Sequence, residues 1–249
     1  MKKKYLLIIL FSILHCFGQK TGTITYKKIS NPIDLTKADI SIQEQLVKTS
    51  KESDKIEYVL NFNEFEVYFY AKKILLQENM FNAYVIIGGG KLKLYQNKKT
   101  QESREYIDSK RVGQVILNKK VLYDWTLTNE SKNIDGYKCF KATSPYFKED
   151  GTKNENPNLM ITAWYCPEIP VKLGPLGYGD LPGLIIELQT KMSTFVAKTI
   201  NLNPEIVPEI DKLTSQKAIS EETYKEMYMG TLNKEQYNAV KESEVKQKK

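Results

Sequence analysis

The chain has 249 residues, of which 37 are Lys or Arg and 30 are Asp or Glu, and its formal net charge is +7. Only two of the cations are arginines, Arg104 and Arg111, although bidentate recognition of phosphates and bases favours arginine over lysine. The composition therefore argues against nucleic-acid binding, and the mild lysine excess is typical of solvated faces.

Residues 1–18 have the three parts of a secretory signal peptide. Three lysines at positions 2–4 form a positive start, an apolar run follows over residues 5–17, and Gly18 is the small residue that a cleavage point requires. The apolar run is shorter than the about 20 residues that span a bilayer, so we expect no transmembrane segment. The sequence thus predicts an exported chain in the periplasm, associated with the outer membrane or secreted.

Removal of the signal peptide also removes the single histidine of the chain, His15. The mature chain, which would begin near Gln19, then has no imidazole for a general base, a Ser-His or Cys-His pair or a metal site. We therefore expect no catalytic residue of the usual hydrolase designs, no metal and no cofactor. Cys16 leaves an alternative open, a lipoprotein whose lipidated cysteine ends the peptide, although His15 stands where a small residue is usual.

Most of the mature chain alternates apolar and polar residues, as β-strands do. Alternation is clearest where Ile56, Tyr58, Leu60 and Phe62 share one face, and a change of phase at Asn63 predicts a turn or bulge. Many short runs between turn signals predict a mainly antiparallel sheet rather than βαβ units. A long loop or a short helix is expected between the first two strands. The predicted strands cover residues 21–29, 56–62, 65–69, 84–87, 91–95, 112–117, 121–127, 137–142, 159–166, 184–189 and 195–202.

The last fifth of the chain changes to helical signals. Ser220 is a good N-cap, apolar residues then follow at helical spacing, and Gly230 ends this first helix. A second short helix is expected from Asn233, and the charged residues 241–249 are expected to form a disordered tail. We therefore predict one β-rich domain over residues 19–240 that includes both helices.

Two cysteines, Cys139 and Cys166, lie on predicted strands that flank one polar loop. If these strands pair with Ala142 opposite Ala163, the two cysteines face each other as a disulfide requires. In an oxidising envelope we expect that disulfide to stabilise the chain by about 3 kcal/mol. Two buried free thiols are the alternative, and a catalytic thiol is not expected because no base accompanies it.

The most distinctive segment of the chain runs from residue 163 to residue 188. It reads AWYCPEIPV over residues 163–171, then Gly174-Pro175, and then DLPGLIIEL over residues 180–188. This segment resembles the signature of the GLPGLI family, exported proteins of Bacteroidota-type bacteria. It departs from the family's hexapeptide at Asp180, where the family has glycine. The resemblance extends upstream through IDGYKC at residues 134–139, and it implies export but no catalytic residue, because the function of the family is not established.

The prolines make this segment stiff, because each fixes φ and biases the preceding residue toward extended geometry. At Asp180, the glycine of the family suggests a positive-φ turn, which aspartate tolerates less well. Our preferred interpretation is that the stiff loop caps an open end of the sheet, with Leu181 and Leu184 in the core. The alternative is the mouth of an apolar ligand groove with two carboxylates at its rim. The groove candidates are Trp164, Tyr165, Glu168, Asp180, Leu181, Pro182 and Leu184.

The predicted fold is a single, strongly curved antiparallel sheet or half-barrel with two short C-terminal helices, by analogy with periplasmic domains of the LolA and RseB kind. The predicted function is non-enzymatic: a binding, carrier, chaperone or accessory protein. Its partner would be an apolar ligand or an envelope protein such as an outer-membrane transporter. Two other functions stay open. One is a hydrolase that uses Glu168 with Asp180 or Glu187, and the other is a structural protein that docks through a strand edge or its C-terminal tail.

Overall fold

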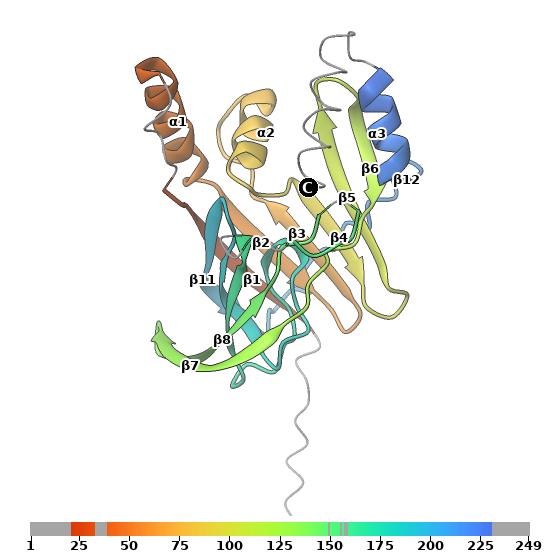
Figure 1. Ribbon diagram of the computed structural model, residues 1–249. Coiled ribbons are helices and arrows are strands. Elements are labelled where there is room, and N and C mark those ends of the chain that lie inside the picture. The colour runs from red at the N-terminus through yellow and green to blue at the C-terminus, as the bar shows by residue number, and fades with distance from the viewer. Residues whose placement is uncertain (1–20, 33–38, 149, 155, 157–158, 231–249) are drawn as a thin grey trace, which may run out of the picture.

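The strands pair into one sheet in the computed structural model, which describes residues 21–32, 39–148, 150–154, 156 and 159–230 (Figure 1). The order across the sheet is β12-β6-β5-β4-β3-β2-β1-β11-β10-β9-β8-β7. Neighbouring strands are antiparallel except β12 and β6, which are parallel, so the sheet is mixed. Its two end strands do not pair with each other, so the described sheet is open. The strands are β1 (Gly22–Ser30), β2 (Glu57–Phe62), β3 (Glu66–Ala71), β4 (Lys93–Asn97), β5 (Glu102–Ser109), β6 (Gly113–Asn118), β7 (Thr126–Ile134), β8 (Tyr137–Ser144), β9 (Ile161–Cys166), β10 (Leu184–Gln189), β11 (Ser193–Asn201) and β12 (Ile219–Ser220).

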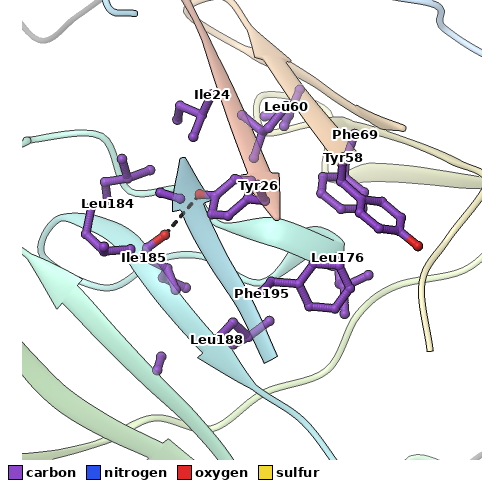
Figure 2. Close-up of a cluster of buried hydrophobic side chains, with 14 of the residues drawn as sticks. Ile24, Tyr26, Tyr58, Leu60, Phe69, Leu176, Leu184, Ile185, Leu188 and Phe195 are labelled. Atoms are coloured by element: carbon purple, nitrogen blue, oxygen red, sulfur yellow. Dashed lines mark hydrogen bonds between the residues drawn. The ribbon is translucent and has the colours of Figure 1, made fainter. Parts of the chain in front are cut away.

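One face of this sheet, here called the inner face, holds the main hydrophobic core. Successive side chains of a strand point to opposite faces, which places Ile24 and Tyr26 of β1 together on the inner face. Both are fully buried, and so are Leu60 of β2 and Phe195 of β11 (Figure 2). The Tyr26 hydroxyl donates a hydrogen bond of 2.9 Å to the backbone carbonyl of Ile185, which ties β1 to β10.

Three helices accompany the strands in the described part of the chain: α1 (Ile40–Ser53), α2 (Glu78–Ile87) and α3 (Glu221–Gly230). α1 connects β1 to β2, α2 connects β3 to β4, and α3 follows β12. Phe81 and Val85 are four residues apart on α2, so they share one helix face, and both are buried. The Ser220 hydroxyl accepts a hydrogen bond of 3.1 Å from the backbone N–H of Thr223, as the predicted N-cap requires.

Two connections cover the two faces of the sheet. Residues 167–183 lie against the inner face and place Leu176 in the main core. Residues 203–218, here called the strap, cross the outer face. Leu213 of the strap packs there against Tyr68 and Tyr95 in a second, smaller cluster.

The mainly β, mainly antiparallel fold confirms the prediction from alternation, with three differences. Residues 84–87, predicted as a strand, are the last turn of α2, because a short apolar run does not distinguish a strand from a buried helix. Residues 121–125, predicted to begin a strand, precede β7 without joining it. β5, the two-residue β12 and the part of β7 after residue 127 were not predicted as strands. The predicted signal peptide, the second C-terminal helix from Asn233 and the tail over residues 241–249 lie outside the described residues.

Candidate functional site

Residues 167–183, which the sequence singles out, fold back as a cover on the start of β10. The backbone N–H of Leu184 donates to the Ile169 carbonyl at 3.0 Å, and that of Ile185 donates to the Leu173 carbonyl at 2.9 Å. Leu181 is 1% exposed and Leu184 is fully buried. This is the arrangement that the capping interpretation predicts for these two leucines.

Three aromatic rings gather against this capping loop. Tyr123 and Trp125 come from the segment before β7, and Tyr178 belongs to the loop. The ring centroids lie 5.6, 5.8 and 6.0 Å apart, within the range of favourable aromatic pairs. Two hydrogen bonds fix the rings: the indole N–H of Trp125 donates to the Gly179 carbonyl at 2.8 Å, and the Tyr123 hydroxyl donates to the Asp180 carboxylate at 2.6 Å.

Two exposed residues neighbour this cluster: Leu122 precedes Tyr123 in the chain, and Tyr146 lies close enough to Tyr178 to affect its pKa; they are 44% and 48% exposed. Burial, together with the neighbouring Tyr146, raises the pKa of Tyr178 to about 12. Burial and the bond to Asp180 also raise the pKa of Tyr123 well above its usual value. Both hydroxyls are therefore neutral at physiological pH and can donate hydrogen bonds. We call this surface the aromatic rim; its members are Leu122, Tyr123, Trp125, Tyr146 and Tyr178.

Asp180 adopts the positive-φ conformation that its position suggested. Its φ is 62°, in the left-handed region that favours glycine. Several bonds compensate for the cost of this conformation in aspartate. The backbone N–H of Asp180 donates to the Lys172 carbonyl at 3.0 Å, and the carboxylate accepts bonds from Tyr123 and, at 3.4 Å, from Lys98. The aspartate thus fastens the capping loop to the aromatic rim and to the turn between β4 and β5.

The structure divides the seven predicted groove residues between buried and exposed positions. Trp164 and Tyr165 are neighbours on β9, so their side chains point to opposite faces of the sheet. Tyr165 is on the core side and only 6% exposed, whereas Trp164 is half-buried on the outer face. These side chains do not line a single surface in this conformation, and a ligand groove at this loop stays a prediction. The buried members are Tyr165, Leu181 and Leu184, and the exposed members are Glu168, Asp180 and Pro182.

Glu187 of β10 is an ion-paired carboxylate on the outer face. The Lys132 ammonium donates to its two oxygens at 3.0 and 2.9 Å, and the Gln189 amide donates at 2.6 Å. The same ammonium lies 4.4 Å from the centre of the Trp164 ring. Glu187 is bound to Lys132, while Asp180 is bound to Tyr123. Asp180 and Glu187, the two carboxylates considered as partners of Glu168 in a hydrolase, therefore each bind a different side chain.

Cys139 and Cys166 are buried free thiols in this structure rather than the predicted disulfide. The predicted register of their strands is confirmed, because Ala142 faces Ala163 and the pairing continues to Phe140 opposite Tyr165. The next opposed positions are those of the two cysteines. Burial, together with the neighbouring Cys166, raises the pKa of the Cys139 thiol to about 12. The thiol of the folded chain is therefore protonated at neutral pH.

The turn between β7 and β8 determines how the two cysteines face each other. Asp135 and Gly136 both have positive φ, 49° and 88°, as in a type I′ two-residue hairpin turn. This turn makes Ile134 and Tyr137 a hydrogen-bonded pair, and the alternation makes Lys132 and Cys139 another. The backbone groups of Cys139 then point toward β7. Toward β9, Cys139 therefore occupies a non-hydrogen-bonded position, where opposed side chains come closest.

Comparison with known proteins gives a match to a family model over part of the chain and a likeness to solved structures. A family model described as a protein of unknown function (Porph_ging) matches residues 147–187, which contain β9, the capping loop and most of β10. The structures of PNGF-II in C2 and P21 space groups match with 16% and 17% identity and TM-scores of 0.50 and 0.49, and each match covers 85% of this chain. The matches cover 33% and 34% of the PNGF-II chains, so this chain spans about a third of their length. At this identity the likeness shows the fold alone. No curated protein matches the sequence.

Sequence reasoning missed most of the aromatic rim. Trp125 stood out through its alternation with Tyr123, but the alternation was assigned to a paired strand. Tyr178 lies inside the distinctive segment, yet no spacing in the sequence brings it to Trp125 or to Tyr146. Within the described part of the chain, no group of three or more His, Cys, Asp or Glu side chains is placed to hold a metal ion.

Proposed function

We propose that this protein is an exported, non-enzymatic envelope protein that binds a protein partner through the aromatic rim. The observation that carries the proposal is that the rim is already rigid, because Trp125 is bonded to Gly179 and Tyr123 to Asp180. Tyrosine and tryptophan are enriched at protein interfaces, where they combine a large apolar area with a polar tip. Side chains that are fixed before binding lose little entropy when the partner arrives.

A ligand on the surface fits this protein better than a ligand enclosed by the sheet. The inner face is filled by the chain's own side chains, including Leu176 from the capping loop and Phe195 from β11 (Figure 2). Two depressions of about 410 Å³ beside Phe65 and about 430 Å³ beside Leu213 are open to solvent. A binding or accessory role therefore has more support than a carrier role, which needs interior room for apolar cargo.

Location and family complete the proposal. The signal-peptide pattern of residues 1–18 supports export. The resemblance of residues 180–185 to the GLPGLI signature supports a place among envelope proteins, and the matched family model spans the same segment. The open sheet is compatible with the strongly curved half-barrel of the LolA and RseB kind, a scaffold that would carry the rim.

An oxidising compartment would join Cys139 and Cys166, because the two thiols occupy opposed positions on β8 and β9. With glutathione disulfide as the oxidant, the two thiols lose two protons and two electrons, and two molecules of glutathione are released. We expect chain isolated from the envelope to resist alkylation when denatured without reductant and to take up two alkyl groups after reduction. Intact mass spectrometry distinguishes these states. Two free thiols in envelope-isolated chain would contradict both the bond and an oxidising location.

The partner can be tested by photocrosslinking in the native host. A photoreactive residue is placed at Leu122 or Tyr146, and at Met227 on α3 as a control, since these are 44%, 48% and 44% exposed. We expect the two rim positions to give the same discrete adduct and position 227 to give none. Replacing both Tyr123 and Tyr178 by alanine should remove the adduct while the folded chain persists. Equal capture at all three positions, or none, would overturn the rim as the binding surface.

The non-enzymatic part of the proposal has its own test. Purified mature chain without a tag is screened for turnover of envelope glycans, peptides and esters. Turnover that a single side-chain change abolishes, without loss of folding, would replace this proposal by an enzymatic one.

A further inference from the structure

Two helical connections leave the sheet at the same end. β1 and β3 run in the same direction, because each is antiparallel to β2 between them. The connection from β1 to β2 holds α1, and that from β3 to β4 holds α2. Both helices therefore stand beyond one end of the sheet, where they contact each other (Figure 1).

The C-terminal ends of both helices are anchored at the sheet, so their N-terminal ends project away from it. Asp54, the C-cap of α1, accepts a hydrogen bond of 2.8 Å from the buried Lys28 of β1. Gly88, the C-cap of α2, packs so closely on the same site that an added Cβ would lie 3.0 Å from the Lys28 nitrogen. At 1.5 Å per residue, helices of 14 and 10 residues extend about 21 and 15 Å from these anchors.

The projecting ends carry exposed apolar side chains. Ile40 and Ile42, in the first turn of α1, are 75% and 47% exposed. Leu75, in the connection before α2, is fully exposed, and Met80 in the first turn of α2 is 42% exposed. Among the described residues of α1, only Ser53 at the anchored end is buried. The apolar side chains at these two tips are thus left in water by the folded domain.

Two lysines come shortly before the most exposed of these residues in the chain. Lys72 and Lys73 precede the run Ile74-Leu75-Leu76, and their side chains are 61% and 78% exposed. Each makes a loose ion pair of 3.6 Å, with Glu57 and Glu78 respectively. Apolar side chains at a tip with cations beside them suit the boundary between lipid headgroups and acyl chains, where lysines meet the phosphates.

We propose that the two helix tips dock this protein onto an anionic lipid surface, with Leu75, Met80 and Ile40 entering the apolar layer. A lipid layer accepts projecting side chains without a matching pocket, whereas a protein partner would need a separate cavity for each tip. In the described part of the chain, no helix is long and apolar enough to cross a bilayer. The proposed docking is independent of the partner proposed for the aromatic rim.

The test uses a fluorophore sensitive to polarity, attached to a cysteine at position 75 of the mature chain. Ile206 is the matched control, because it is 83% exposed and lies far from α1 and α2. It follows the C-terminal end of β11, where Asn201 pairs with Thr23 at the start of β1, and this end of the sheet is opposite the one that carries α1 and α2. The native thiols are buried, so the label goes to the introduced cysteine. With vesicles of phosphatidylcholine and phosphatidylglycerol, we expect a blue shift at position 75 and none at position 206. Equal shifts, or none at position 75, would overturn the proposal.

Vesicle sedimentation provides the second measurement. Leu75→Glu should lower the bound fraction of the otherwise native chain by about tenfold or more. The leucine that would enter the lipid is replaced by a negative charge, which the anionic headgroups repel. Ile206→Glu, which makes the same charge change, should leave binding unchanged. Leaving out phosphatidylglycerol, or raising the salt, should weaken binding through Lys72 and Lys73. Equal sedimentation of both variants and the parent chain would refute the insertion of Leu75.

Discussion

Lys28 is a buried lysine whose ammonium group ties both projecting helices to the sheet. It donates hydrogen bonds of 2.8 Å to Asp54 and 2.9 Å to the Ser30 hydroxyl. The C-terminal ends of α1 and α2 both meet there, and the partial negative charge of each helix end adds to the Asp54 carboxylate. A lysine side chain that is 0% exposed is therefore compensated by a carboxylate and two helix dipoles.

We expect Lys28→Met to lower the free energy of unfolding by about 2 to 3 kcal/mol, because it leaves Asp54 without its cation. The loss is placed below that of a fully buried pair because the Asp54 side chain is 34% exposed. Lys27→Met is the matched control on the opposite, exposed face of β1, and it should change stability by less than about 0.5 kcal/mol. Urea unfolding measures both. Equal effects of the two substitutions would show that the Lys28 ammonium contributes nothing.

Two buried tyrosines of the core differ in whether their hydroxyls are satisfied. The Tyr26 hydroxyl donates to the Ile185 carbonyl at 2.9 Å. The Tyr58 hydroxyl has no hydrogen-bond partner among the described residues, although its side chain is fully buried between Phe69 and Phe195. Burial raises the pKa of both tyrosines, so both hydroxyls stay protonated.

The same substitution should therefore act in opposite directions at these two sites. Tyr26→Phe removes a made hydrogen bond and should cost about 1 kcal/mol, whereas Tyr58→Phe removes an unsatisfied hydroxyl and should be neutral or stabilise by up to about 1 kcal/mol. Each variant controls for the other, since both are the same change in the same core. A loss of stability in Tyr58→Phe that matches that of Tyr26→Phe would mean that the Tyr58 hydroxyl is bonded in solution.

The strap over residues 203–218 is anchored to the outer face by one carboxylate of β3. Glu66 accepts bonds of 2.7 Å from Lys212, 3.0 Å from Asn63 and 2.8 Å from the Tyr95 hydroxyl. These bonds, that of Lys212 first, lower the pKa of Glu66 to about 2. The folded protein therefore binds a proton at this site less readily than the unfolded chain does.

This depressed pKa predicts how stability changes with pH. The contribution of Glu66 is fully present above the ordinary carboxyl pKa of 4.5, and it is lost as the pH falls through about 2. Glu66→Gln should therefore lower stability near neutral pH and flatten its decline over this acidic range. Glu57, whose pKa is also lowered, stays in both proteins, so the difference between the two pH profiles belongs to Glu66. Parallel profiles of parent and variant would contradict the anchoring role.

The sequence identified elements where one face is buried and misidentified them where the pattern carries less information. Tyr58, Leu60 and Phe62 share the buried face of β2 as the alternation predicted. Asn63 lies where the change of phase predicted a turn or bulge, and its side chain accepts bonds from the following backbone N–H groups. β5 was missed because its residues are mostly polar, and its buried Glu105 is neutralised by Lys91, a partner on another segment. α2 was misread because a four-residue window cannot separate periods of 2 and 3.6.

The candidate site was less accessible to sequence reasoning than the strands were. The burial of Leu181 and Leu184 agrees with the expectation from the stiff prolines around them. The aromatic rim joins residues 122–125 to Tyr146 and Tyr178, and only the folded capping loop brings them together. Sequence periodicity reports which face of an element is buried, not which loops meet.

At the scale of the whole molecule, the first strand of the chain lies in the middle of the sheet. β1 pairs with β2 on one side and with β11 on the other. The pairing with β11 covers eight residue pairs, from Thr23 to Ser30 of β1. It thereby joins the half formed by β2 to β6 and β12 to the half formed by β7 to β11. The main core also spans both halves, since it contains residues from β1 to β4 and from β8 to β11. Neither half has a separate core of comparable size.

We therefore expect the two halves to unfold together. Both tryptophans of the chain, Trp125 and Trp164, belong to the half from β7 to β11, so their fluorescence reports that half, whereas far-ultraviolet circular dichroism reports all strands. The two signals should give the same midpoint in urea, as a two-state transition requires. Tyr26→Phe should shift both midpoints equally, because the Tyr26 hydroxyl connects β1 to β10 across β11. A fluorescence transition that precedes the dichroism transition would show instead that β1 does not couple the halves.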